Sequence, residues 1–176
     1  MQWLSRELAE PEQQRARECG GSVFAEMDKL AAKISAGSEG VLFLPYMAGE
    51  RSPIWNPYAK GVFYGLDFTK TRAHFYRAAM EGVAYSLRHN LEIAAQTGAP
   101  VTQLHAMGGA ANSKLWTQIK SDVTGLPIRS AKSDMATTLG AAMLAGVATG
   151  VYKDYAQAVQ QTVNMERSYV PNEENS

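Results

Sequence analysis

The spacing of hydrophobic residues along the first half of the chain predicts helices that alternate with short strands. Apolar positions recur every three or four residues in three segments, as they do on one face of a helix. Two short apolar runs bounded by glycine or proline predict strands, and the first of them is short enough to indicate a buried strand. In chain order, the expected elements are a short helix and a loop within 1–21, a helix at 22–34, strands at 41–44 and 61–66, and a helix at 71–97.

The second half of the chain repeats this alternation. In the first half, Ser22 and Thr71 stand at the starts of two predicted helices and are suited to cap them, because their hydroxyl oxygens can accept hydrogen bonds from the free amides of a first turn. The alternation as a whole predicts an α/β fold in which helices cover a sheet. The expected elements here are a strand at 104–107, a helix at 113–124, a short strand beginning at 127, and helices at 138–149 and 155–163.

The balance of charges excludes several classes of partner. The 176 residues include 17 basic and 17 acidic side chains, which are interspersed, and 45% of the residues are hydrophobic. This composition indicates one globular domain and offers no charged face for nucleic acid or a membrane surface. The longest apolar stretch, 139–151, is shorter than the roughly 20 residues of a membrane span, and the first thirty residues show no secretion signal. The single cysteine, Cys19, cannot form an internal disulfide, so we expect a cytoplasmic location.

A glycine pair between a predicted strand and a predicted helix is the strongest candidate for a binding site. Gly108 and Gly109 allow the backbone to turn and a flat ligand to approach without meeting a Cβ atom, and Ala110 follows them. Asn112 and Ser113 offer side-chain hydrogen bonds, and the free amides of the helix start favour a negatively charged group. The local pattern also fits an ordinary turn in which Ser113 only caps the helix. It lacks the spacing of a phosphate-binding Walker loop.

The proline-rich loop at 45–60 is a second candidate. Glu50 and Arg51 are adjacent in it, and they could face a phosphate or a sugar or equally pair with other surface groups. Three aromatic side chains in the same loop could stack on a sugar, although such residues more often anchor a loop to the core. They are Tyr46, Trp55 and Tyr58.

The remaining ionisable residues indicate structural roles. The three histidines, His74, His89 and His105, match no zinc-binding spacing, so no metal site is predicted. Glu81 lies on the long predicted helix, where burial and pairing are expected. We interpret Asp122 as a surface carboxylate and Asp134 as the N-cap of the next helix.

Several of these segments together resemble a known family. The run Gly61–Leu66, the pair His74-Phe75 and the stretch Ala78–Glu81 match, in order and spacing, the second signature of the FGGY carbohydrate kinases. Further segments are similar to the xylulokinase type of that family, among them the 43–46, 49–53 and 56–59 stretches, the glycine pair with Trp116, and 139–142. The resemblance covers nearly the whole chain.

The resemblance implies a fold and a set of site residues. It implies an actin-like, ribonuclease H-like ATPase domain, of which residues 1–176 form part of the C-terminal, nucleotide-binding portion, with the N-terminal sugar-binding domain outside this chain. ATP or ADP with Mg²⁺ is the implied cofactor. Gly108, Gly109 and Ala110 match the adenosine motif, and Asn112 and Ser113 are expected near the base or ribose. The helix at 139–146 is expected to pack behind this site, and 50–51 to lie near the cleft.

Two functions are then expected as alternatives. In the first, the chain is the nucleotide-binding part of an ATP-dependent kinase that phosphorylates a ketopentose such as xylulose. Because the general base of the family lies upstream of the matched segments, no catalytic residue is expected in 1–176, and the isolated chain should be inactive. Its partners are then a nucleotide, and a sugar only when the missing domain is present. In the second, the chain is a non-enzymatic remnant that binds a partner or forms a homo-oligomer through exposed apolar surface.

Overall fold

The computed structural model describes residues 1–131 and 136–175, and in the first half it contains every helix and strand expected from the sequence and one further α-helix, α2. Ser22 caps its helix as expected, because its Oγ accepts a hydrogen bond from the Phe24 amide at 3.2 Å. Thr71 occupies the N-cap position of the longest helix. The elements are α1 (Gln2–Glu7), α2 (Glu10–Cys19), α3 (Val23–Ala31), η1 (Ser38–Gly40), β1 (Leu42–Leu44), β2 (Val62–Tyr64) and α4 (Arg72–Gln96).

The second half contains the expected elements and one further strand. Helix α5 ends at Gly125, whose φ of 67° lies in the left-handed region that favours glycine. The strand that the sequence did not predict, β5, follows the last helix. The elements are β3 (Leu104–Ala106), η2 (Gly109–Asn112), α5 (Lys114–Thr124), β4 (Ile128–Ala131), α6 (Ala136–Ala148), α7 (Tyr155–Thr162), β5 (Met165–Tyr169) and η3 (Glu173–Asn175).

The strands form two small sheets rather than one. Strands β1 and β2 pair in antiparallel fashion, with Phe43 opposite Phe63. In the other sheet β4 lies in the centre, parallel to β3 and antiparallel to β5. Helices cover both sheets on one side, so the α/β class expected from the sequence is confirmed, in the form of two short sheets.

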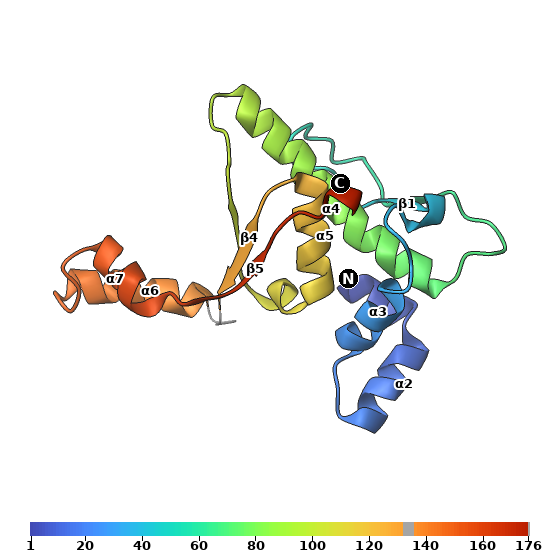
Figure 1. Cartoon of the computed structure of the whole chain (residues 1–176), viewed down its shortest axis with the longest axis horizontal. Helices are drawn as coiled ribbons and strands as arrows, with labels where there is room; N and C mark the ends of the chain where they lie inside the picture. The colour runs from blue at the N-terminus through green and yellow to red at the C-terminus, as the bar shows by residue number, and fades with distance from the viewer. Residues whose placement is uncertain (132–135, 176) are drawn as a thin grey trace.

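Helix α4 is the centre of the hydrophobic core. Figure 1 shows α4 crossing the body of the molecule. Helix α5 lies alongside it, and α3 and β1 lie near its N-terminal half. The ring of Phe63 stacks on that of Phe43, with centroids 4.3 Å apart, and contacts Phe75 of α4 at 4.7 Å. The largest fully buried apolar side chains include Tyr76 and Met80 of α4, and Met27 of α3. The core therefore joins α3, α4, α5 and the β1–β2 sheet.

Two expectations for the first half were wrong. The polar segment after α1 is not a loop but the helix α2. It begins with a proline in its first turn, ends at Gly20 in a left-handed conformation, and buries Glu12, which accepts a hydrogen bond from the Tyr76 hydroxyl at 2.9 Å. Strand β1 is not fully buried, because only Phe43 faces the core, while Leu42 is 41% exposed. The short apolar run therefore belongs to a sheet with one covered face.

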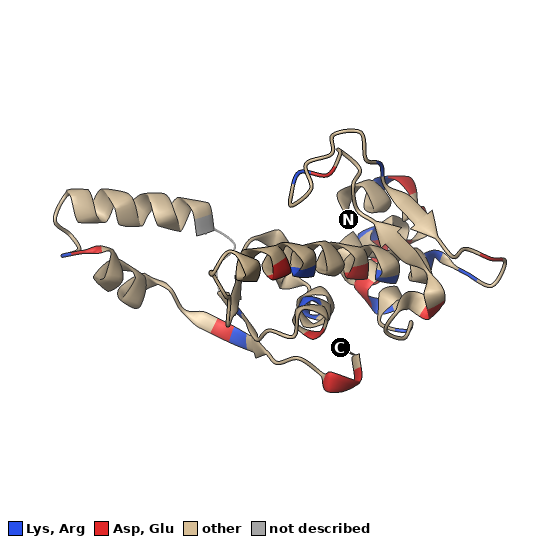
Figure 2. Ribbon diagram, turned by 90° about the horizontal axis from the view of Figure 1, so that it is seen from above, with Lys and Arg blue, Asp and Glu red and all other residues tan. Residues whose placement is uncertain are grey.

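The position of α6 also differs from the expectation that 139–146 packs behind the nucleotide site. Helix α6 packs on α7, and Figure 1 shows both helices, in orange, projecting from the body. The ring of Tyr152, from the turn that follows α6, packs directly against Gly146. The close packing at this glycine is therefore with the α6–α7 segment itself and not with the nucleotide site. Leu144 is exposed. No charged residue lies between Ala136 and Ala148, and α6 is tan throughout its described length in Figure 2.

Elsewhere Figure 2 shows basic and acidic residues interspersed along the helices. No helix in the described part of the chain is both long enough and apolar enough to cross a membrane.

Candidate functional site

The turn between β3 and α5 has the backbone geometry expected of a glycine pair. Gly108 has a φ of 79°, a conformation that a residue with a Cβ atom adopts only under strain. Gly109 then begins the short helix η2, its φ lies outside that region, and a Cβ built on it would meet no atom within 4 Å. The backbone conformation therefore requires glycine at position 108. At position 109 a side chain would be tolerated by the fold, and glycine leaves open space beside the turn.

A cavity of about 870 Å³ opens beside this turn. Its volume lies in the range of about 300–1,000 Å³ typical of small-molecule sites. Four of the five residues singled out from the sequence line it, namely Gly109, Ala110, Asn112 and Ser113, while the fifth, Gly108, precedes the short helix η2 and is not a lining residue. The other lining residues come from α1 with the chain start (Met1, Gln2, Trp3), from α3 and its cap (Ser22, Phe24, Ala25, Asp28), from α4 (Met80) and from α5 (Trp116).

The walls of the cavity are largely apolar and aromatic. Trp3 and Phe24 are both exposed, so their rings are accessible from solvent. The indole of Trp116 is held in place because its Nε1 donates a hydrogen bond to the Met80 carbonyl at 3.0 Å. Lys120 lies 4.1 Å above the ring of Trp116, and burial lowers the pKa of its amine. A flat apolar ligand would find three aromatic side chains in the wall of this cavity, Trp3, Phe24 and Trp116.

Ser113 both caps α5 and holds the one carboxylate in the cavity wall. Its Oγ accepts a hydrogen bond from the Trp116 amide at 3.0 Å, so the capping interpretation of the turn is correct. The same hydroxyl group is hydrogen-bonded to Asp28 of α3. Burial raises the pKa of the Asp28 carboxyl, and the hydrogen bond from Ser113 offsets part of that rise. Capping and lining the cavity are thus compatible roles for Ser113.

The sequence alone did not predict that residues of α3 line the cavity. The three- and four-residue spacing of apolar residues in the 22–34 segment marks the face that includes Met27 and Ala31, which is buried. Phe24 and Asp28 are spaced by four residues and share the other face, which lines the cavity. The available signal was Phe24, a large aromatic residue on the polar side of an amphipathic helix.

The Glu50 loop is separate from the cavity. Glu50 is 4% exposed, and its Oε2 accepts hydrogen bonds from the amides of Trp55 at 2.6 Å and Ile54 at 3.1 Å. Its backbone also pairs with Asn56 in both directions. Among the described residues, the Glu50 Oε1 atom has no hydrogen-bond partner. Glu50 therefore holds the loop closed, while Arg51 is exposed and neither residue lines the cavity.

Glu81 has the buried, structural role that the sequence indicates. Its carboxylate accepts hydrogen bonds from Arg77 Nε at 2.6 Å, from the Ser38 hydroxyl at 2.7 Å and from the Gly37 amide at 3.0 Å. Both members of the ion pair, Glu81 and Arg77, are buried. The pair fixes the 37–40 segment against α4, and it lies outside the cavity wall.

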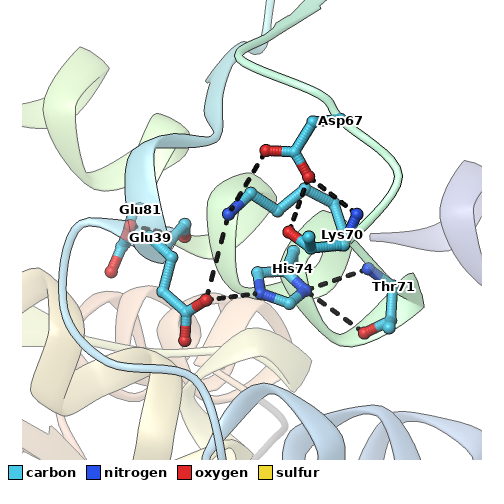
Figure 3. A network of polar contacts seen from close by, with 8 residues as sticks. Glu39, Asp67, Lys70, Thr71, His74 and Glu81 are labelled. Atoms are coloured by element: carbon cyan, nitrogen blue, oxygen red, sulfur yellow. Dashed lines mark hydrogen bonds and ion pairs between the residues drawn. The ribbon is translucent and has the colours of Figure 1, made fainter.

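Figure 3 shows the neighbouring network at the start of α4. His74 Nδ1 accepts a hydrogen bond from the Thr71 amide at 3.0 Å, and the opposite ring nitrogen lies 3.1 Å from Glu39 Oε2. Lys70 lies 3.9 Å from Glu39 and 4.0 Å from Asp67. Because Nδ1 is an acceptor here, the proton of the neutral ring sits on Nε2 and points to Glu39. His74 is therefore a capping residue.

Removing the His74 ring should lower stability measurably. His74→Ala leaves the Thr71 amide without its acceptor, and the expected loss is about 1 kcal/mol in the free energy of unfolding, as for other capping contacts. His74→Gln keeps an acceptor at the position where capping boxes carry glutamine, so it should lose less. Urea unfolding followed by circular dichroism compares the two variants. Equal losses for both would contradict a capping role.

Asp122 is not the surface carboxylate that the sequence suggested. It is 4% exposed, and its Oδ1 accepts hydrogen bonds from Gln118 at 2.6 Å and from the Asn172 amide at 2.9 Å. Sequence spacing missed this because Asn172 is distant along the chain. The other acidic residue in that interpretation, Asp134, lies outside the described residues.

Comparison with known proteins identifies the family. A profile of the C-terminal domain of the FGGY family of carbohydrate kinases matches residues 1–149. This chain belongs to the FGGY family. The resemblance seen in the 61–81 signature is therefore confirmed, and the α/β fold is that of FGGY kinases, with the actin-like ATPase architecture.

The FGGY relatives differ in substrate. The gluconokinase of Bacillus subtilis (strain 168) is 34% identical over 177 aligned positions, covering 100% of this chain and 34% of the relative. The crystal structure of the xylulose kinase from Rhodospirillum rubrum matches with a TM-score of 0.81 and 31% identity, over 99% of this chain and 33% of that one. The Plasmodium falciparum glycerol kinase with ADP matches with a TM-score of 0.73 and 26% identity, over 84% of this chain and 29% of that one. The chain thus spans about a third of the length of the relatives it matches.

Proposed function

We propose that the cavity beside the 108–113 turn holds the adenosine of ATP or ADP, and that this chain is the nucleotide-binding part of an ATP-dependent sugar kinase. The observation that carries the proposal is the convergence of Gly109, Ala110, Asn112 and Ser113 on one apolar cavity of about 870 Å³. Support comes from the structure of a family member, a glycerol kinase, with ADP. The open backbone at Gly109 gives a purine ring a surface without a Cβ atom.

The sugar in this proposal is a ketopentose such as xylulose. The xylulose kinase of Rhodospirillum rubrum supports that choice, while the gluconokinase of Bacillus subtilis is matched at similar identity. Phosphoryl transfer depends on groups that position both substrates and stabilise the transferred phosphoryl, and the chain spans a third of its relatives. We therefore propose that the isolated chain binds nucleotide without transferring phosphate.

Magnesium enters this proposal as the counter-ion of the nucleotide phosphates. Within the described residues, no group of three or more His, Cys, Asp or Glu side chains is arranged to hold a metal ion. The ion would therefore be carried mainly by the phosphate oxygens of the nucleotide, as is usual for Mg²⁺ at such sites. The exposed, unpaired Cys19 supports a cytoplasmic site of action in this proposal.

A calorimetric titration of the chain with Mg-ADP tests the nucleotide site. We expect saturable binding that Gly109→Val weakens about tenfold or more, because the added side chain projects into the cavity while the fold leaves space for it. Gly140→Val is the matched control, since that glycine also has open space around it and lies outside the cavity. It should bind ADP as the wild-type chain does.

Two outcomes would count against the proposal. If Gly109→Val keeps the affinity of the wild-type chain, ADP binds elsewhere. If the folded wild-type chain shows no binding at millimolar ADP, the nucleotide function fails and the second candidate function replaces it.

The second candidate is self-association of a non-enzymatic kinase remnant. One observation favours it, which is the apolar outer face of the β1–β2 sheet, where Leu42 stands opposite Tyr64 and Leu44 opposite Val62, all four exposed. Phe68 in the following loop is exposed as well. A patch of this kind is typical of protein contacts. This candidate predicts a dimer in sedimentation together with no ADP binding.

A further inference from the structure

We propose that the Asp28 carboxylate accepts hydrogen bonds from the ribose 2′- and 3′-hydroxyls of the bound nucleotide, and so makes the cavity selective for ribonucleotides. This inference rests on the proposed nucleotide function and assigns a role to a residue outside the 108–113 turn. Asp28 is the only carboxylate in the cavity wall as the described residues define it.

The first argument is that Asp28 is held in place but not neutralised. Its fixed contact is the hydrogen bond with Ser113. Since Ser113 Oγ accepts from the Trp116 amide, the hydroxyl proton is free to be donated to the carboxylate. In the described part of the chain no Lys, Arg or His forms an ion pair with Asp28. A carboxylate has about four acceptor positions, so most of its capacity is open to a ligand.

The second argument concerns the direction of the phosphates. The first turn of α5 was expected to attract a negatively charged group, and the structure shows this chain's own carboxylate hydrogen-bonded at that position. Two like charges 4 Å apart repel by about 1 kcal/mol in bulk water and about 4 kcal/mol at an effective dielectric constant of 20. The phosphates of a nucleotide therefore point away from Asp28, and an uncharged donor of the nucleoside faces it.

The third argument selects the ribose among those donors. Apart from the polar residues Gln2, Ser22, Asn112 and Ser113, the rest of the wall is mainly apolar or aromatic, with Phe24, Ala25 and Met80, and suits the flat purine. A partly buried carboxylate without a cation gains most from several donors at once. The vicinal hydroxyls of ribose supply two adjacent donors on separate oxygen atoms, whereas the two N–H bonds of the adenine amine diverge from one nitrogen, so only one of them can face a given carboxylate. The geometry thus favours the sugar edge of the nucleoside at Asp28.

The test compares Asp28→Asn with the wild-type chain, titrated with ADP, 2′-deoxy-ADP, 3′-deoxy-ADP and IDP. Asparagine keeps the shape of the side chain and an oxygen for Ser113, but it loses the charge and replaces the second acceptor oxygen with an NH2 donor. We expect the wild-type chain to prefer ADP over either deoxy analogue by about tenfold, as for hydrogen bonds to a charged group. In Asp28→Asn, ADP should weaken by a similar factor, and the preference over both analogues should shrink toward one.

Glu26→Gln is the matched control, because Glu26 lies on the same helix, pairs with Lys29 and does not line the cavity. Its affinities and preferences should equal those of the wild-type chain. An unchanged preference of Asp28→Asn for ADP over the deoxy analogues overturns the proposal. So does a loss of discrimination between ADP and IDP alone, which would put the carboxylate on the adenine amine. Absence of saturable ADP binding by the wild-type chain overturns the nucleotide function and this inference with it.

Discussion

Glu81→Leu is expected to destabilise the chain by about 3–5 kcal/mol, the range found when one partner of a buried ion pair is removed. Glu81 is 3% exposed and Arg77 8%, so the remaining guanidinium stays buried without a counter-charge. The Ser38 hydroxyl and the Gly37 amide lose their acceptor at the same time. A decrease of this size consumes a large part of the stability of an ordinary domain. Urea unfolding followed by circular dichroism measures it.

A double-mutant cycle separates the charge from the packing. Arg77→Met combined with Glu81→Leu removes both charges, and the double variant should lose clearly less than the sum of the two single losses. Glu81→Gln keeps acceptors for Ser38 and Gly37 and should fall between the wild-type chain and Glu81→Leu. Additive single losses, or a loss below about 1 kcal/mol for Glu81→Leu, would show that the pair is not coupled.

The position of Glu81 shows what the family signature does in this chain. Of the stretch from Gly61 to Glu81, only Met80 lines the cavity. Phe63 and Phe75 pack around Phe43, and His74 caps α4. The signature therefore mainly builds the contact between α4 and the β1–β2 sheet, while all of the cavity wall except Met80 comes from other segments. A motif can identify a family and still consist mainly of packing residues.

The parts of the fold that the sequence predicted well are those with local signals. The long helix was expected at 71–97 and is observed at Arg72–Gln96, because Thr71 begins it and Gly98, with a φ of 84°, follows its end. Strand β5 has no such signal. Its residues Met165–Tyr169 are mostly polar, and it forms because it pairs with β4, a contact between distant parts of the chain.

The residues of the candidate site also fall into those that the sequence predicted and those that it did not. The 108–113 turn could be identified because a glycine pair between a strand and a helix has a local meaning. Asp28 could not be, because its role depends on the packing of α3 beside Ser113, a residue 85 positions later in the chain (113 − 28). Similarly, the packing of α6 on α7 is a tertiary feature that small residues at 139–146 do not specify. Turns, caps and glycine pairs can be predicted from neighbouring residues in a single sequence, whereas contacts between distant segments are known only from the fold.

Gly82→Val should prevent stable folding or lower the free energy of unfolding by more than about 3 kcal/mol. A Cβ atom on Gly82 would overlap the carbonyl oxygen of Phe43 and lie 3.1 Å from its carbonyl carbon. These are backbone atoms of β1, so no side-chain rotation can relieve the overlap, and α4 must separate from the strand. The Phe43–Phe63 stack lies at the same joint and should be disturbed with it. Thermal unfolding by circular dichroism, with near-ultraviolet spectra for the aromatic packing, measures both effects.

Gly140→Ala provides the comparison for Gly82. Both glycines lie inside helices, but a Cβ atom on Gly140 would meet nothing within 4 Å. Replacing a helical glycine by alanine then gains up to about 1 kcal/mol, because alanine restricts the unfolded chain and favours the helix. The two variants should thus shift the unfolding temperature in opposite directions. A small shift for Gly82→Val would mean that α4 and β1 can move apart without loss, and that the packing joint at the centre of the fold is looser than the contact of Gly82 with the Phe43 backbone indicates.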